Sequence, residues 1–237
     1  MSTVGRRSGV VAAYVEQGAS PAALRIAAEG AAMRGASLRV LDHIEQDAAE
    51  QLVRESAGAD LLVIGSRSDA STATLRFDAI ARTLAHRAQC PVMFVPAAGD
   101  VTDLSDVVCG IDRSTGSAAA LRWAARESAM RGGTVLAEQV LPRPVGYGEE
   151  LSESLSSWVF AQRIKEPTTI MCRLVWGASP ATDLAHTAMQ RGALLVVGSH
   201  RSDGGHLHRC ITGRLAGHTS VPVVVVPPEI PTPRMAL

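Results

Sequence analysis

A block of sequence near the start of the chain recurs 97 residues later, and this repetition constrains the fold more than any other feature. Residues 22–35 read AALRIAAEGAAMRG and residues 119–132 read AALRWAARESAMRG, so that ten of the 14 positions are identical. Two further blocks recur in the same order: GADLLVIGS at 58–66 with GALLVVGS at 192–199, and CPVMFVP at 90–96 with VPVVVVP at 221–227. The chain is therefore expected to hold two copies of one structural unit.

The spacing of these blocks differs between the two copies. The first block recurs after 97 residues, whereas the second and third recur after 133 and 131 residues. The second copy thus gains 36 residues between its first two blocks. That length suits one extra helix and one extra strand, because parallel neighbours need crossovers of about a dozen residues or more. We expect a truncated domain at 1–100, a complete domain at 101–228 and a Pro-rich tail at 229–237.

Short aliphatic runs alternate with helical patterns in both copies, which indicates an α/β fold. Helices are predicted at residues 20–33, 46–56, 77–87, 117–130, 151–164, 180–190 and 207–217. Strands are predicted at residues 9–14, 37–41, 61–64, 92–95, 107–111, 134–140, 169–175, 194–197 and 221–226. Each copy is expected to form a doubly wound parallel sheet, five-stranded in the second copy and lacking one helix and one strand in the first.

The composition excludes several classes of partner and compartment. Lys+Arg and Asp+Glu balance at 23 each and no basic stripe is visible, so neither nucleic acid nor a membrane is an expected partner. No run of 18 apolar residues exists, and the start lacks the apolar length of a signal peptide, so we expect a soluble, cytoplasmic protein. The four cysteines form no CxxC pair and are expected to be small core residues in a reducing compartment.

Several motifs together carry a resemblance to a known family. The strand that ends GIDRS at 110–114, the helix AALRWAA, the sequence VVGS at 196–199 and the final VPVVVVP resemble the universal stress protein family, over nearly the whole chain and twice over. The resemblance implies a sheet order of 3-2-1-4-5. ATP-binding members use an Asp after strand one near the adenosine, and a G-x-x-G-x9-G-[ST] loop after strand four. Glycines in such a loop let backbone N–H groups approach phosphates.

In the second copy, the resemblance places a candidate nucleotide site on two loops. Asp112 matches the family Asp and Gly198 the first loop glycine, whereas Arg201 and Arg209 replace the other two glycines and Cys210 replaces the Ser or Thr. The loop is two residues short, and two further glycines inside it add flexibility. With the neighbouring strand ends included, the candidate cofactor-binding residues are Asp112, Ser114, Val140, Gly198, Arg201, Gly204, Gly205 and Arg209.

The first copy departs further from the family pattern and is expected to bind no ATP. Val15 stands where the Asp belongs, and only Gly65 keeps a loop position. Ser68 and Asp78 replace the other glycines, with Ala79 in the Ser place. The carboxylate of Asp78 would repel a phosphate.

The residues leave several functions open. The chain is interpreted as a stress-response regulator with ATP bound in the second copy, as a nucleotide-independent protein-interaction module, or as a slow ATPase; no catalytic residue is identifiable, so no enzyme is expected. A metal site at His200, His206, His208 and Cys210, and a nucleophile at Ser114 or Ser199, are weaker hypotheses. A purely structural alternative has Asp112 cap a turn or helix and Gly198 permit a tight strand exit.

The two copies are expected to pack together as a pseudo-dimer. In the family, last strands commonly pair edge to edge across a dimer, which satisfies their exposed N–H and C=O groups. Residues 92–95 and 223–226 are apolar enough to pair in this way within one chain. The absent third strand leaves residues 37–41 at a sheet edge, where a homo-oligomer or another protein partner would bind.

Overall fold

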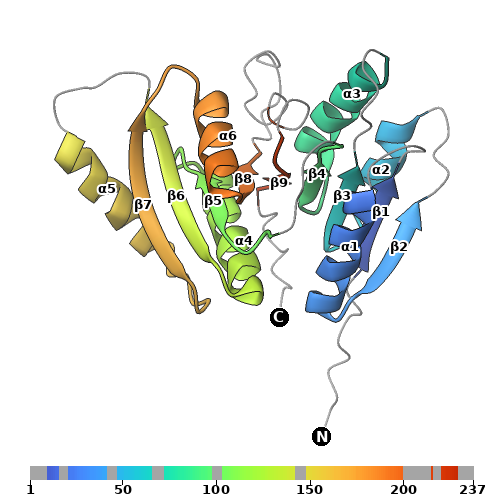
Figure 1. Ribbon diagram of the computed structural model, residues 1–237, viewed down its shortest axis with the longest axis horizontal. Helices are drawn as coiled ribbons and strands as arrows, with labels where there is room; N and C mark the ends of the chain where they lie inside the picture. Colours follow the sequence, from blue (N-terminus) through green and yellow to red (C-terminus); the bar gives the residue numbers. More distant parts are fainter. Residues whose placement is uncertain are drawn as a thin grey trace, which may run out of the picture.

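The computed structural model describes residues 10–15, 21–41, 47–65, 72–97, 103–141, 148–199, 215 and 220–228, without the side chains of 10, 15, 72–78, 148 and 149. Six helices and nine strands lie in this part of the chain (Figure 1). The helices are α1 (Pro21–Arg34), α2 (Ala48–Ser56), α3 (Thr72–Arg87), α4 (Thr115–Arg131), α5 (Gly148–Ala161) and α6 (Pro180–Arg191). The strands are β1 (Val10–Val15), β2 (Ser37–Leu41), β3 (Leu61–Gly65), β4 (Val92–Val95), β5 (Val107–Gly110), β6 (Thr134–Leu141), β7 (Thr169–Trp176), β8 (Leu194–Gly198) and β9 (Val223–Val226).

All nine strands belong to one sheet, in the order β2-β1-β3-β4-β9-β8-β5-β6-β7. The second repeat contributes β7-β6-β5-β8-β9, which is the expected order 3-2-1-4-5. The first repeat contributes β2-β1-β3-β4, and among the described residues only α2 lies between β2 and β3. The predicted absence of one helix and one strand is confirmed there, and β2 lies at an edge of the sheet as predicted.

The two repeats are joined by their last strands, as predicted. Within each repeat the strands are parallel, but β4 pairs with β9 in the antiparallel sense. Val92, Met93 and Phe94 lie opposite Val225, Val224 and Val223, and all six residues are buried. The two repeats therefore share one continuous hydrogen-bonded sheet.

Helices cover both faces of this sheet, which is the doubly wound arrangement that the sequence predicts. Apolar side chains of α1, α4 and α5 pack on one face, among them Ile26, Leu121 and Leu155. Those of α2, α3 and α6 pack on the other, among them Leu52 and Leu184. Both hydrophobic clusters contain residues of both repeats, so the core is continuous across the junction.

Some element boundaries differ from the predicted ones. The last strand begins at Val223 rather than at residue 221, because Pro222 has no N–H to donate to a ladder; its carbonyl accepts from Leu195 N at 3.0 Å. Helix α3 begins at Thr72 rather than at residue 77. The helix predicted at 207–217 lies outside the described residues, except for Leu215, which is helical.

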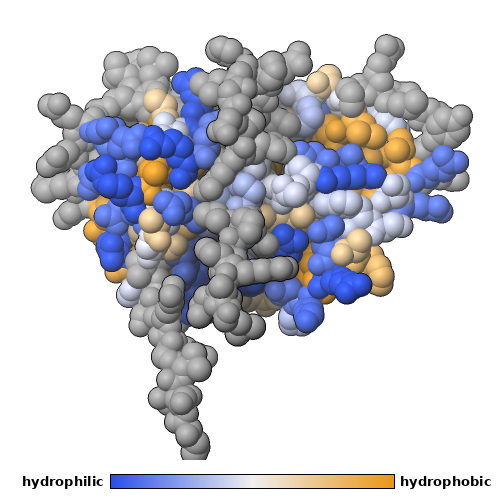
Figure 2. Space-filling model, turned by 180° about the vertical axis from the view of Figure 1, so that it is seen from behind, coloured by the Kyte–Doolittle hydropathy of each residue, from blue (hydrophilic) through white to orange (hydrophobic). Residues whose placement is uncertain are grey.

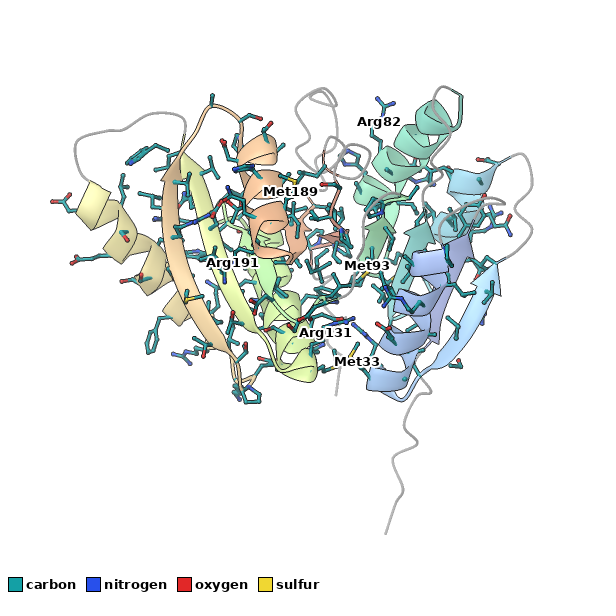
Figure 3. The ribbon with its side chains drawn as sticks, in the orientation of Figure 1. Met33, Arg82, Met93, Arg131, Met189 and Arg191 are labelled. Carbon is teal, nitrogen blue, oxygen red and sulfur yellow. The ribbon has the colours of Figure 1, made fainter. Side chains whose placement is uncertain are left out.

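A buried group of charges links the helices of the two repeats near their C-terminal ends. Glu127 of α4 is 1% exposed and accepts from Arg131 Nε at 2.8 Å, and it also forms an ion pair with Arg34 of α1. Figure 3 shows Arg131 and Met33 close together between the ends of α4 and α1. Arg34 and Arg131 occupy equivalent repeat positions, and the equivalent of Glu127 is Gly30. One carboxylate therefore serves two equivalent arginines.

The described surface is mixed in character. Seen from behind, hydrophobic surface is divided into separate patches by hydrophilic residues (Figure 2). The most exposed large apolar side chains include Phe160 at 87% and Val40 at 47%. Among the described residues, every helix is too short or too polar to span a lipid bilayer.

Candidate functional site

The strand order places the candidate loops of the second repeat beside each other. β5 lies between β6 and β8 and is parallel to both, so the three strands end at the same edge of the sheet. Asp112 follows β5, Val140 lies near the end of β6, and Gly198 ends β8. β6 and β8 lie on opposite sides of β5, so the direction in which strands are added to the sheet reverses here. Crevices in open α/β sheets form at such switch points. The expectation that residues 112 and 198 leave neighbouring strands is confirmed.

Asp112 and Ser114 shape the start of α4. Asp112 Oδ1 accepts from Ser114 N at 2.9 Å and from Ser114 Oγ at 2.5 Å. Ser114 is the N-cap residue of α4, and its Oγ accepts from Ser117 N at 3.1 Å. The turn holds the Asp112 carboxylate on the exposed side of the loop. Both residues therefore have a structural task, as the structural alternative expects.

Gly198 lies against the backbone of α4. A Cβ atom at Gly198 would lie 2.3 Å from the carbonyl carbon of Gly116, and a Cβ at Gly116 would lie 2.6 Å from the Ser199 carbonyl oxygen. Distances this short exclude a side chain at either position. Two glycines thus let the exit of β8 contact the first turn of α4. The sequence comparison identified Gly198 but missed Gly116, whose only signal is its place in that first turn.

Arg113 is a further residue of this edge that sequence reasoning missed. Its φ angle is 66°, a left-handed backbone conformation that residues other than Gly, Asn and Asp rarely adopt. Its guanidinium donates to Ser154 Oγ at 2.7 Å and to Gln139 Oε1 at 3.2 Å. The contacts tie the loop after β5 to β6 and α5.

Val140 and Gly198 lie on different sides of the sheet. Val140 packs on the hydrophobic cluster beneath α6, and its Cγ1 lies 3.1 Å from where a Cβ at Gly177 would be. Gly198 instead faces α4. Asp112, Ser114, Val140 and Gly198 thus lie at the same edge of the sheet. Val140, however, lies on the face covered by α6, whereas Gly198 lies on the face covered by α4.

The remaining predicted residues of this site are not part of the described structure. Arg201, Gly204, Gly205 and Arg209 lie outside the described residues, as do His200, His206, His208 and Cys210 of the metal hypothesis. Within the described ranges, no group of three or more His, Cys, Asp or Glu side chains is placed to hold a metal ion.

The offset between equivalent residues of the two repeats is different for the first strands and for the first helices. Val107 of β5 pairs with Leu194, whereas Val11 of β1 pairs with Leu61. Leu61 and Leu194 are 133 residues apart and equivalent, so Val11 is the counterpart of Val107, at a distance of 96 residues. The helices α1 and α4 repeat at 97 residues. The second repeat therefore has one extra residue between strand and helix.

This register corrects one prediction about the first repeat. Glu16, and not Val15, stands at the position of Asp112, because Val15 still belongs to β1 and lies opposite Gly65. The first repeat has therefore kept an acidic residue at the strand exit, and the prediction that it has lost one is wrong. Glu16, Ser68 and the side chain of Asp78 lie outside the described residues.

Two of the three described cysteines are core residues, as expected, and Cys172 is partly buried against the core. Cys90 and Cys109 are buried and carry free thiols. Burial raises the pKa of the Cys90 thiol to about 12, and it also raises the pKa of Cys109. Neither thiol is ionised near neutral pH, so neither is an activated nucleophile.

Comparisons with known proteins identify the class to which this fold belongs. The sequence model of the universal stress protein family matches residues 45–96 and 104–227, which is most of the chain. A universal stress protein of Mycolicibacterium smegmatis is 30% identical over 202 residues, covering 78% of this chain and 67% of the relative. The chain belongs to the universal stress protein family.

Solved structures show the same fold. The crystal structure of a universal stress protein from Archaeoglobus fulgidus has a TM-score of 0.59 at 16% identity, covering 86% of this chain and 74% of that one. A Pseudomonas aeruginosa protein of unknown function has a TM-score of 0.54 at 14% identity, covering 93% and 82% of the two chains. At these identities the similarity concerns the fold alone.

Proposed function

We propose that this chain is a stress-response regulator whose second repeat binds an adenine nucleotide at the carboxyl ends of β5, β6 and β8. Membership of the universal stress protein family supports the regulatory class. The nucleotide proposal rests chiefly on one observation: Asp112 and Gly198 leave neighbouring parallel strands at the switch point of the sheet.

The local chemistry supports a nucleotide in two ways. The Asp112 carboxylate lies on an exposed loop, where its acceptor oxygens suit the hydroxyl groups of a ribose. The N-terminus of α4 begins two to three residues later, and its dipole favours a negatively charged group such as a phosphate. Both repeats have lost two loop glycines, but the first repeat has the carboxylate of Asp78 where the second has Arg209, and a carboxylate repels a phosphate. We therefore propose nucleotide binding for the second repeat only.

Titration calorimetry with ATP on matched variants tests this proposal. Asp112→Asn removes the charge but retains an Oδ1 acceptor for the Ser114 turn, so the loop is expected to keep its shape. Glu16→Gln is the equivalent change in the first repeat. We expect one site per chain, with affinity lowered about tenfold or more by Asp112→Asn, because hydrogen bonds to charged groups are strong, and unchanged by Glu16→Gln.

Two results would overturn the nucleotide proposal. One is the absence of ATP binding by the intact chain, and the other is an equal loss of affinity in both variants. Assaying the same samples for phosphate release tests the third alternative, a slow ATPase, which predicts turnover above the rate without protein.

A nucleotide-independent interaction module is the second candidate, and two observations favour it. Asp112 Oδ1 caps the turn before α4, and Gly198 contacts Gly116, so both residues have a structural role without a ligand. Under this alternative, neither the intact chain nor the Asp112→Ala variant binds ATP, and the substitution only lowers the melting temperature.

A further inference from the structure

A groove runs along α4 at the junction of the two repeats, apart from the candidate nucleotide site. Its volume is about 320 Å³. One wall is a face of α4 that carries Arg122, Trp123 and Arg126, and the opposite parts come from the residues before β4 and those after β9. β4 and β9 are neighbours in the sheet, so the groove requires both repeats (Figure 1). Neither Asp112, Ser114, Val140 nor Gly198 lines it.

The groove combines apolar rings with positive charge. The indole of Trp123 and the rings of Pro91, Pro227 and Pro228 form its apolar part. Two cations, Arg122 and Arg126, and one anion, Glu166, form its charged part. The three charges leave an excess of one positive charge.

Each of the two arginines has one long contact with a side chain beyond α4. Arg122 Nη1 donates to the neutral Gln162 Oε1 at 3.4 Å. Arg126 Nε lies 3.9 Å from Glu166 Oε1, at the outer limit of an ion pair, and its side chain is 69% exposed. An exposed pair at this separation is weak, so an incoming anion competes with it at low cost.

The first repeat offers an internal comparison for this helix face. At a distance of 97 residues, Arg122 and Arg126 correspond to Arg25 and Glu29. Those two side chains form an ion pair with each other at 3.0 Å. Ile26 stands in the position of Trp123. The second repeat thus has an aromatic ring and a second cation where the first repeat has an aliphatic side chain and a neutralised pair.

We propose that this groove binds a small organic anion that carries an aromatic ring. The ring lies against Trp123 and the prolines, and the carboxylate, sulfonate or phosphate group accepts hydrogen bonds from Arg122 and Arg126. Arginine forms paired hydrogen bonds with such groups and also stacks on flat rings. A volume near the lower end of the range for ligand pockets limits the ligand to a small molecule.

Binding of anilinonaphthalene sulfonate, an aromatic sulfonate, to the folded full-length chain tests this proposal. We expect saturable binding at one site, and fluorescence and calorimetry both measure it. Replacing both arginines (Arg122→Ala with Arg126→Ala) is expected to weaken binding about tenfold or more, since charged hydrogen bonds are lost. Arg126→Glu is the second variant, because this exposed side chain tolerates replacement; it is expected to weaken binding more than Arg126→Ala.

The duplication supplies the matched control. Arg25→Ala with Glu29→Ala changes the equivalent positions of α1 and is expected to leave binding unchanged. Asp112→Asn is also expected to leave it unchanged, which separates this site from the proposed nucleotide site. Equal affinity of the wild-type chain and the Arg122/Arg126 variant would overturn the proposal, as would equally tight binding of the uncharged phenylnaphthylamine. A large gain of affinity on deletion of residues 229–237 would identify that segment as the occupant and would also overturn it.

Discussion

At the scale of single residues, Glu127 is a buried carboxylate that depends on ion pairs from both repeats. Its carboxylate is 1% exposed and is held between Arg34 and Arg131. Removing one partner of a buried ion pair leaves the other charges buried without compensation. By contrast, Glu29 of α1 pairs with Arg25 on the surface, where both side chains are nearly half exposed.

We predict that Glu127→Ala lowers the free energy of unfolding by about 3–5 kcal/mol, because two largely buried arginine side chains lose their carboxylate. Glu29→Ala, the control, is expected to cost less than about 1 kcal/mol, because its ion pair is solvated and screened. Urea unfolding followed by circular dichroism measures both. Similar losses in the two variants would show that burial does not determine the strength of this contact.

Sequence reasoning predicted part of the residue-scale picture. It identified Asp112 and Gly198 from the family pattern, and both lie at neighbouring strand exits. It placed Val15 at the acidic position, because the alignment followed the helices and missed the extra residue after β5. The contact between Arg34 and Glu127 joins residues 93 positions apart, and no local pattern reports such a pair.

At the scale of elements, the β4–β9 junction is short and fully buried. Met93 and Val224 lie opposite each other at its centre, and both are 0% exposed. β2, at the far edge of the sheet, is mostly exposed, and its Val40 is 47% exposed. Two valines in strands of the same sheet thus experience opposite environments.

Val224→Lys is predicted to lower the free energy of unfolding by about 4 kcal/mol or more, because it buries an unpaired charge between the repeats. Val40→Lys should change it by about 1 kcal/mol or less, because the side chain reaches water at the edge. Thermal unfolding and size-exclusion chromatography of both variants check the difference. A stable, compact Val224→Lys protein would contradict the central position of this junction.

Most elements were predictable because their sequence signals are local. Aliphatic runs gave the strands to within two residues, and Gly132 ends α4 in a left-handed conformation with φ of 72°, as its place after the helix predicts. Helix α3 begins earlier than predicted because residues 72–76, TATLR, carry apolar residues too sparsely to show a helical period. Which helix covers which face of the sheet had no local signal and followed only from the fold.

At the scale of the whole molecule, the single sheet makes the two repeats dependent on each other. Each hydrophobic cluster draws on both repeats, and β4 and β9 occupy each other's open edges. An isolated repeat would expose an apolar edge strand, which promotes aggregation.

Fragments 1–100 and 101–237, produced together, are therefore predicted to copurify as a one-to-one complex. Fragment 1–100 produced alone should aggregate, because Val92–Val95 loses its partner strand. Val224→Lys in the second fragment serves as the control and should abolish copurification. Affinity capture through a tag on one fragment makes the measurement, and two soluble fragments that ignore each other would contradict the prediction.

The buried ion pair between α1 and α4 joins two different repeats and could not form between two copies of the first repeat. In a protein that pairs with its own copy across a two-fold axis, every contact occurs twice, once in each direction. Two first repeats facing each other would bring two Arg34 side chains together with Gly30 on both sides, so that like charges would meet without an acid. Covalent fusion removes this symmetry requirement and lets the two repeats diverge. As a consequence, the first repeat can no longer pair with a copy of itself.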